Sequence, residues 1–134
     1  MDKKVILISI DGLRPDAVET CGHSFVNTLK ENGCYSLDAS SVVPPVTLPA
    51  HTSIFYSVLP IRHGIITNDY MPPVRPIRGL AEQLERADKT CAAFYGWEPM
   101  RHVWTSGNMK YSFFVNEYEE DNSDLLLTQE ALSL

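Results

Sequence analysis

The most constraining feature of this chain is a short apolar run near its N-terminus that ends abruptly in an acid and a glycine. Residues 5–10 are β-branched or leucine except for Ser9, and Asp11 and Gly12 follow directly. A run of this kind is typical of a central strand in a parallel sheet, where both faces of the strand are buried. Because parallel strands need crossover connections, the run indicates an α/β protein.

The rest of the chain alternates between helical and strand patterns. Predicted helices cover residues 15–18, 24–32, 50–59, 80–87 and 122–134, further strands cover residues 34–43 and 90–95, and a proline-rich loop covers residues 60–76. This order predicts a mainly parallel sheet with helices on both faces. Residues 1–134 are expected to form one domain without an internal boundary. The last helix reaches Leu134 without a glycine, cation or polar tail, so we expect the domain to be incomplete.

Charge and hydropathy exclude several classes of partner. The chain has 11 Lys and Arg against 17 Asp and Glu, a net charge of −6. An acidic chain without a basic block is a poor ligand for DNA or RNA, so no nucleic-acid polymer is expected as a partner. No apolar stretch approaches the roughly 18 residues of a membrane span, and no cleavable signal is evident, so we expect a cytoplasmic protein without a membrane partner. Three cysteines without CxxC spacing predict reduced thiols.

Two side chains stand where an α/β sheet gathers its ligands. Asp11 follows the most buried strand, at the end where open parallel sheets bind ligands, and a carboxylate there suits a divalent metal ion. Thr47 precedes a helix, whose unpaired amides and dipole attract negative charge. Both residues have plainer alternative roles, Asp11 in a turn and Thr47 as a helix N-cap. If the two βα units are adjacent, the acid and the hydroxyl would lie across one crevice.

Three ordered motifs connect these residues to a known family. They are VILISIDGLR at residues 5–14, TLPAH at residues 47–51 and HGIITN at residues 63–68. Together they resemble the N-terminal part of the alkaline phosphatase superfamily, and within it the nucleotide pyrophosphatase/phosphodiesterase (type I phosphodiesterase) group is the most similar. The resemblance implies an alkaline phosphatase-like fold, with residues 1–134 as the N-terminal part of a single catalytic domain.

The resemblance also implies a reaction and the residues that carry it. The group hydrolyses phosphodiester or pyrophosphate bonds in nucleotides and other small phosphoesters, at a site with two divalent metal ions, usually zinc. Carried over to this sequence, Thr47 would be the catalytic nucleophile that forms a phosphothreonine intermediate, and Asp11 and Thr47 would both be metal ligands. Asn68 would bind substrate by donating its side-chain amide to a non-bridging phosphoryl oxygen. These groups suit phosphoryl transfer, because one metal ion would activate the bound hydroxyl while the second metal ion and the amide would stabilise charge on the phosphoryl oxygens.

Several alternatives stay open from the sequence. Sulfatases of the same superfamily need a cysteine or serine where Thr47 stands, but phosphonate hydrolases and phosphoethanolamine transferases also use threonine. The family's remaining metal ligands, in Asp-x-x-x-His and Asp-His motifs, have no match here, so the chain could be a non-catalytic α/β module that keeps only an anion-binding helix start. His51 could reach the site or pack beneath it. An open sheet edge and a helix face with Leu125, Leu126 and Leu132 would favour self-association.

Overall fold

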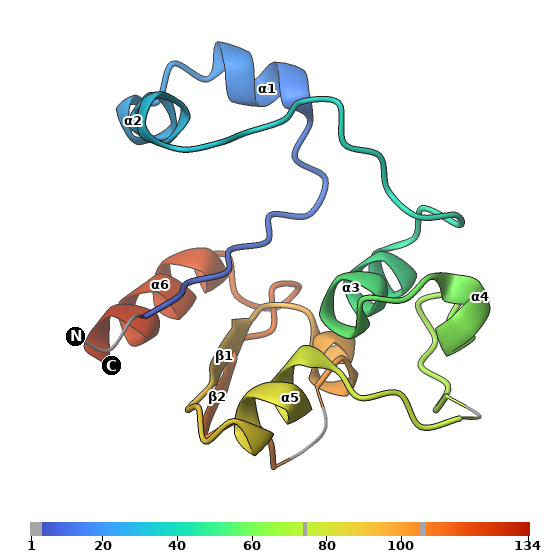
Figure 1. Ribbon diagram of the computed structural model, residues 1–134. Helices are drawn as coiled ribbons and strands as arrows, with labels where there is room; N and C mark the ends of the chain where they lie inside the picture. Colours follow the sequence, from blue (N-terminus) through green and yellow to red (C-terminus); the bar gives the residue numbers. More distant parts are fainter. Residues whose placement is uncertain (1–3, 74, 105–106) are drawn as a thin grey trace. The chain divides into compact units, whose positions relative to one another are not determined.

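The computed structural model describes residues 4–73, 75–104 and 107–134 (Figure 1). They divide into two compact units, Met1–Ser40 and Ser41–Leu134. Every buried side chain among the described residues belongs to the second unit. The second unit is therefore the one with a packed core, and it also contains two of the three predicted site residues, Thr47 and Asn68.

The first unit contains two helices but none of the strands predicted for it. The helices are α1 (Pro15–Thr20) and α2 (Ser24–Asn32), and both agree with the predicted positions. The prediction of a strand over residues 5–10 is wrong for this structure, since these residues form no strand and Val5 and Ile6 are 90% and 83% exposed. The strand predicted over residues 34–43 is absent as well. A strand needs a neighbouring backbone to pair with, and the described part of this unit offers none.

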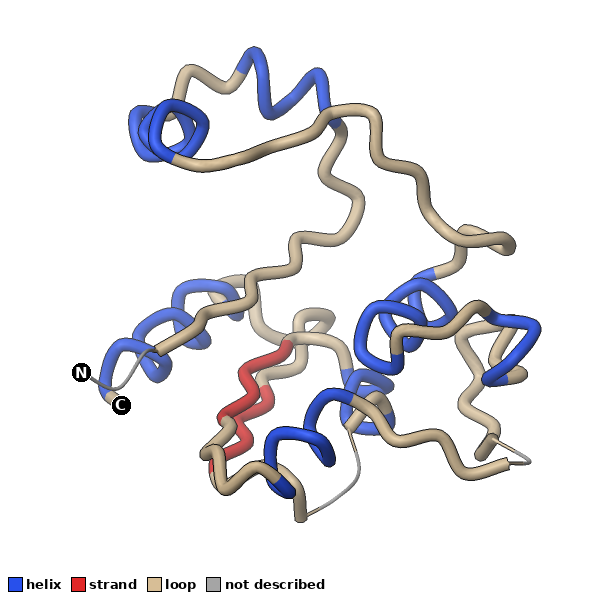
Figure 2. The backbone as a smooth tube through the Cα atoms, in the orientation of Figure 1, coloured by secondary structure: helices blue, strands red, loops and turns tan. Residues whose placement is uncertain are grey.

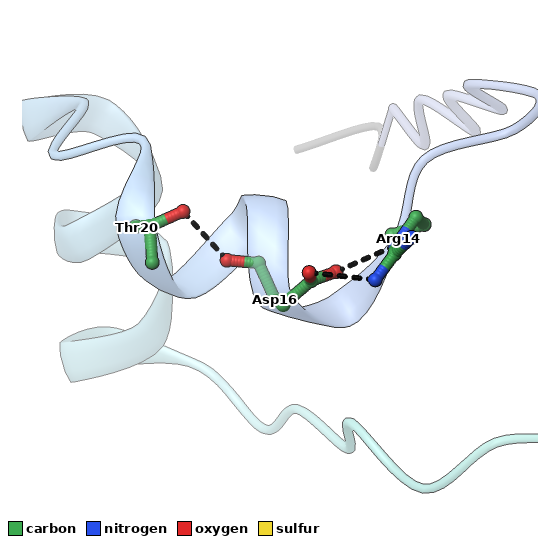
Figure 3. Close-up of polar contacts among 3 residues, drawn as sticks. All are labelled: Arg14, Asp16 and Thr20. Atoms are coloured by element: carbon green, nitrogen blue, oxygen red, sulfur yellow. Dashed lines mark hydrogen bonds and ion pairs between the residues drawn. The ribbon is translucent and has the colours of Figure 1, made fainter.

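Helix α1 begins with a proline and an exposed ion pair. Pro15 occupies the first helical position, where a backbone N–H would have no helical partner. The Arg14 guanidinium donates to both carboxylate oxygens of Asp16, at 2.9 and 2.8 Å, and the Thr20 hydroxyl donates to the Asp16 carbonyl at 2.8 Å (Figure 3). Because the ion pair is exposed to solvent, it shapes the first turn but contributes little to stability.

The second unit contains the remaining helices and a small parallel sheet (Figure 2). In chain order its elements are α3 (Thr47–Tyr56), α4 (Pro60–His63), α5 (Leu80–Arg86), β1 (Ala92–Tyr95), the 3-10 helix η1 (Glu98–His102), β2 (Tyr111–Phe114) and α6 (Ser123–Ser133). Strands β1 and β2 are parallel, with Ala92 opposite Tyr111 and Tyr95 opposite Phe114. This arrangement is compatible with an incomplete α/β domain. Two strands among the described residues do not confirm an alkaline phosphatase-like sheet with helices on both faces, which stays a prediction.

The core of the second unit gathers around Trp104. Tyr95 of β1 and Phe55 of α3 meet its indole edge to face, with ring centroids 5.2 and 5.8 Å away. The buried apolar side chains of this core are Leu48, Ile65, Ala81, Ala93, Val103 and Trp104. The core therefore joins α3 to the sheet and fixes the helix on which Thr47 lies.

Helix α3 begins and ends earlier than the predicted residues 50–59. It ends at Tyr56 because Ser57 adopts a left-handed conformation with a φ of 55°. Helix α4 then begins at Pro60 and ends at His63, because the next residue, Gly64, is a second left-handed residue, whose φ of 79° suits glycine. These two turns bring the residues after α4 back against α3.

Helix α6 packs against both strands and keeps part of its apolar surface in solvent. The Tyr111 hydroxyl of β2 donates to the Glu130 carboxylate of α6, which ties the helix to the sheet. Three leucines of α6 nevertheless remain exposed: Leu125, Leu126 and Leu132 are 55%, 38% and 81% exposed. Among the described residues, neither α6 nor any other helix has the length and apolar character of a membrane span.

Candidate functional site

Thr47 is the first residue of α3, and its half-buried side chain stands at the N-terminus of this helix. It is not the N-cap that the sequence suggested. Val46 holds that position with an extended backbone, and its carbonyl accepts the Ala50 N–H at 3.0 Å. Because valine has no side-chain acceptor, the first amides of α3 need a partner from elsewhere in the chain.

That partner is Asn68, in the loop after α4. Its side-chain Oδ1 accepts the Leu48 N–H at 3.0 Å across a sequence separation of 20 residues. This is the contact that an N-cap side chain usually makes. The loop therefore closes onto the start of α3, and the structure brings the predicted site residues Thr47 and Asn68 together. Since Oδ1 is the acceptor, Nδ2 is the atom of the Asn68 amide that can donate to a ligand.

The same contact limits what the backbone of α3 offers to an anion. The Leu48 N–H is bonded to Asn68, and the next residue, Pro49, has no N–H. Two of the amides that a helix N-terminus normally presents are thus not available to a ligand. This counts against a module that keeps only an anion-binding helix start, and it leaves the side chains of Thr47 and Asn68 as the main polar groups here.

His51 lies one helical turn after Thr47 and packs beneath it. The residue is 8% exposed, and its Nδ1 lies 2.9 Å from the Thr47 carbonyl oxygen. Because a carbonyl oxygen can only accept, Nδ1 carries the proton. His51 therefore supports the first turn of α3. Of the two roles considered for it, reaching the site or packing beneath it, the structure shows the second.

His63, the last residue of α4, is 1% exposed and is bonded through both ring nitrogens. Its Nδ1 accepts the Ile65 N–H at 3.1 Å, and its Nε2 lies 3.0 Å from the Ser53 hydroxyl of α3. Burial lowers the pKa of His63 below its usual 6.5, and a hydrogen bond with the Pro49 backbone opposes this shift to a lesser extent. The ring is therefore neutral near pH 7, with its proton on Nε2. Nothing in the sequence except its place in HGIITN pointed to these contacts.

Asp11 belongs to the first unit, where it is exposed. Its Oδ1 accepts the Gly12 N–H at 3.0 Å, and Gly12 has a φ of 68°. These contacts are those of a turn residue, the plainer of the two roles considered for Asp11. Its role as a metal ligand opposite Thr47 stays a prediction. Among residues 4–73, 75–104 and 107–134, no group of three His, Cys, Asp or Glu side chains could hold a metal ion.

Comparison with known proteins identifies the family of the chain. The sequence model of the family Type I phosphodiesterase / nucleotide pyrophosphatase matches residues 5–110. The chain therefore belongs to this family, which confirms the resemblance seen in the three motifs.

Individual relatives point in the same direction. The chain is 36% identical over 103 residues to human (Homo sapiens) ectonucleotide pyrophosphatase/phosphodiesterase family member 1. The matched region covers 75% of the chain and 10% of the human protein. The rat (Rattus norvegicus) protein of the same name is 30% identical over 105 residues, or 77% of the chain and 11% of the rat protein. The chain thus spans about a tenth of the length of these relatives. No solved structure matches it.

Proposed function

We propose that the full-length protein containing these residues is a metal-dependent hydrolase of phosphodiester or pyrophosphate bonds, with nucleotides among its substrates. Thr47 is the proposed nucleophile. Membership of the phosphodiesterase and nucleotide pyrophosphatase family supports the reaction class, because the matched residues include both Thr47 and Asn68. The observation that carries the assignment of residues is the 3.0 Å bond from the Leu48 N–H to Asn68, which holds a side-chain amide beside the start of α3.

In the proposed reaction, the Thr47 hydroxyl oxygen attacks phosphorus while the bond from phosphorus to the leaving alcohol or nucleotide breaks. The hydroxyl proton passes to solvent, and the leaving oxygen takes a proton from solvent. Water then attacks the phosphorus of the threonine adduct, which releases the phosphorylated product and restores Thr47. In both steps Nδ2 of Asn68 donates to a non-bridging phosphoryl oxygen, where negative charge builds.

Two divalent metal ions, zinc by the resemblance, belong to the proposal, with Asp11 and Thr47 among their ligands. A zinc site takes roughly three or four protein ligands, and the described residues contain no group of three candidates. The residues present thus do not fit a complete metal site by themselves. The remaining ligands would have to come from other parts of the full-length protein.

The proposal is tested with substrates that share one leaving group. The full-length protein is assayed on an aryl phosphodiester, an aryl phosphonate and an aryl sulfate, with zinc or manganese added. We expect the phosphodiester to be hydrolysed fastest and Thr47→Ala to abolish activity. Thr20→Ala, which removes an exposed hydroxyl from α1, is the matched control and should leave activity unchanged. Faster turnover of the sulfate or the phosphonate would refute the substrate class, and full activity of Thr47→Ala would refute the nucleophile.

A second proposal concerns residues 1–134 on their own, which we propose to be catalytically inactive. The observation behind it is that the described residues offer no group of three metal ligands. The exposure of Leu125, Leu126 and Leu132 also favours self-association of the isolated chain. A cytoplasmic location remains a prediction from the sequence.

A further inference from the structure

We propose that His63 is a positioning residue, which uses both ring nitrogens to hold the loop that presents Asn68 to the start of α3. The consequence for catalysis rests on the proposed function, because it assumes that Asn68 binds substrate. The structural link from His63 to Asn68 does not depend on that function, so the two can be tested separately.

The first part of the link runs from α3 through His63 to the loop. On one side of the ring, Nε2 is within hydrogen-bond distance of the Ser53 hydroxyl, in the middle of α3. On the other side, Nδ1 accepts the Ile65 N–H, the second amide after α4. Ile65 is itself buried, at 3% exposed, and lies three residues before Asn68. The ring thus fixes the beginning of this loop against the same helix that Asn68 caps.

The far end of the loop is anchored by a different contact. The ring of Tyr70, two residues after Asn68, stacks on the ring of His102 with centroids 4.3 Å apart and planes 9° from parallel. His102 belongs to η1, and η1 packs against α3. Asn68 is exposed but is held between two anchored ends, so its side chain keeps its place over the Leu48 N–H without being buried.

Hydrogen bonding by His63, and not only the volume of its ring, is what this arrangement requires. An apolar side chain could fill the space but would leave the Ile65 N–H and the Ser53 hydroxyl without their partner. Asparagine carries an acceptor close to the position of Nδ1, and glutamine carries a donor close to the position of Nε2. The variants His63→Leu, His63→Asn and His63→Gln therefore separate packing, the bond to Ile65 and the bond to Ser53.

The test is amide hydrogen exchange of the 134-residue chain, measured by NMR at Ile65 and Leu48. In His63→Leu and His63→Gln we expect both amides to exchange about five- to tenfold faster, the change that follows loss of one hydrogen bond of ordinary strength. In His63→Asn, which keeps an acceptor for the Ile65 N–H but loses the bond to Ser53, we expect Ile65 to stay protected. Leu48 should then exchange faster than in the unmodified chain but more slowly than in His63→Leu. His23→Ala is the matched control, because His23 makes the same kind of contact, Nδ1 with the Phe25 N–H at 3.3 Å, at the start of α2. It should leave Leu48 unchanged.

Two results would overturn the inference. One is a Leu48 amide that stays protected in His63→Leu, which would mean that packing is sufficient. The other is an Asn variant that behaves like the Leu variant. If every His63 variant also loses protection in β1, the whole unit has unfolded, and Ser53→Ala decides instead. That variant keeps the ring and should still speed exchange at Leu48, whereas unchanged exchange at Leu48 would refute the link.

Activity of the full-length variants forms the second arm of the experiment. If the proposed function holds, His63→Asn should keep more of kcat than His63→Leu, in the same order as the protection of Leu48. If the unmodified protein hydrolyses no phosphodiester, the proposed function fails while the exchange result stands. If the protein is active but Leu48 protection does not depend on His63, the inference alone fails.

Discussion

Substitution of Asn68 separates the structural task of its oxygen from the proposed catalytic task of its nitrogen. Oδ1 accepts the Leu48 N–H, while Nδ2 is the proposed donor to substrate. Asn68→Ala removes both groups. Asn68→Asp keeps an acceptor for the Leu48 N–H but replaces the donor with a second carboxylate oxygen. The two variants are therefore expected to differ in stability and to agree in their loss of activity.

The expected stability changes follow from the place of Asn68 at the start of α3. Loss of a capping side chain costs about 0.5–2 kcal/mol, so Asn68→Ala should lower the free energy of unfolding by about 1 kcal/mol. With a urea m-value of about 1–3 kcal/mol/M, the midpoint moves down by about 0.3–1 M. Asn68→Asp places a negative charge at a helix N-terminus, which stabilises by about 0.3–1 kcal/mol, so this variant should be at least as stable as the unmodified chain.

Stability is measured by urea unfolding of the 134-residue chain, followed by tryptophan fluorescence. Trp104 reports on the second unit, which contains Asn68, because it is 8% exposed and its indole meets Phe55 of α3. Activity is measured on the full-length variants with an aryl phosphodiester. The kcat of Asn68→Ala and of Asn68→Asp should fall about 10²–10³-fold, the usual effect of removing one donor to a charged transition state.

Asn116 provides the matched control for these two variants. Its Oδ1 also accepts a backbone N–H, that of Tyr118 at 3.2 Å, in an exposed turn of the same unit. Asn116→Ala and Asn116→Asp should leave kcat unchanged. If Asn68→Asp proves as unstable as Asn68→Ala, the contact with Leu48 is not made in solution. If Asn68→Asp keeps full kcat, Nδ2 is not the donor.

Three further predictions concern pH, metal and association. Burial lowers the pKa of His63 in the folded state, so the unfolded state binds more protons than the folded state as the pH falls. The contribution of His63 to the free energy of unfolding is therefore complete above pH 6.5 and declines below it. The urea midpoint should therefore fall on acidification, and His63→Asn should reduce that fall; an equal fall in both proteins would contradict the reasoning. Isothermal titration of the 134-residue chain with zinc should reveal no pair of tight sites, since the described residues contain no group of three ligands, and two tight sites per chain would refute this. Light scattering should show a mass that rises with concentration because Leu125, Leu126 and Leu132 are exposed, whereas a monomer at every concentration would be the opposite result.

Helices were predictable from the sequence because their signals are local. The apolar spacing of α2, α5 and α6 and the proline at the start of α1 place these helices to within a few residues. Strands were less predictable because a strand exists only with a partner. Residues 5–10 have the strongest strand pattern of the chain and form no strand, while β2 was not predicted and forms because β1 lies beside it.

The same distinction holds for the candidate site: its local motifs were predictable from the sequence, but its contacts between distant residues were not. The motif order that contains Thr47 and Asn68 was sufficient to predict the family, which the comparison confirmed. The sequence did not show that Asn68 caps α3, because that bond joins residues 20 apart through a loop whose path depends on His63 and Ile65. The capping role that the sequence left open for Thr47 is not seen, for a related reason. The helix begins one residue earlier than a threonine N-cap would allow, and a distant side chain supplies the cap.

The proposal that Thr47 attacks phosphorus is tested most directly by trapping its covalent adduct. The full-length protein, with zinc added, is mixed with an aryl phosphodiester, quenched in acid within one turnover and analysed by peptide mass spectrometry. We predict a mass increase on the peptide that contains Thr47, equal to the substrate less its leaving alcohol, located on Thr47 by fragmentation and absent in Thr47→Ala. Substrate turnover without an adduct at Thr47, together with full turnover by Thr47→Ala, would contradict the proposed mechanism.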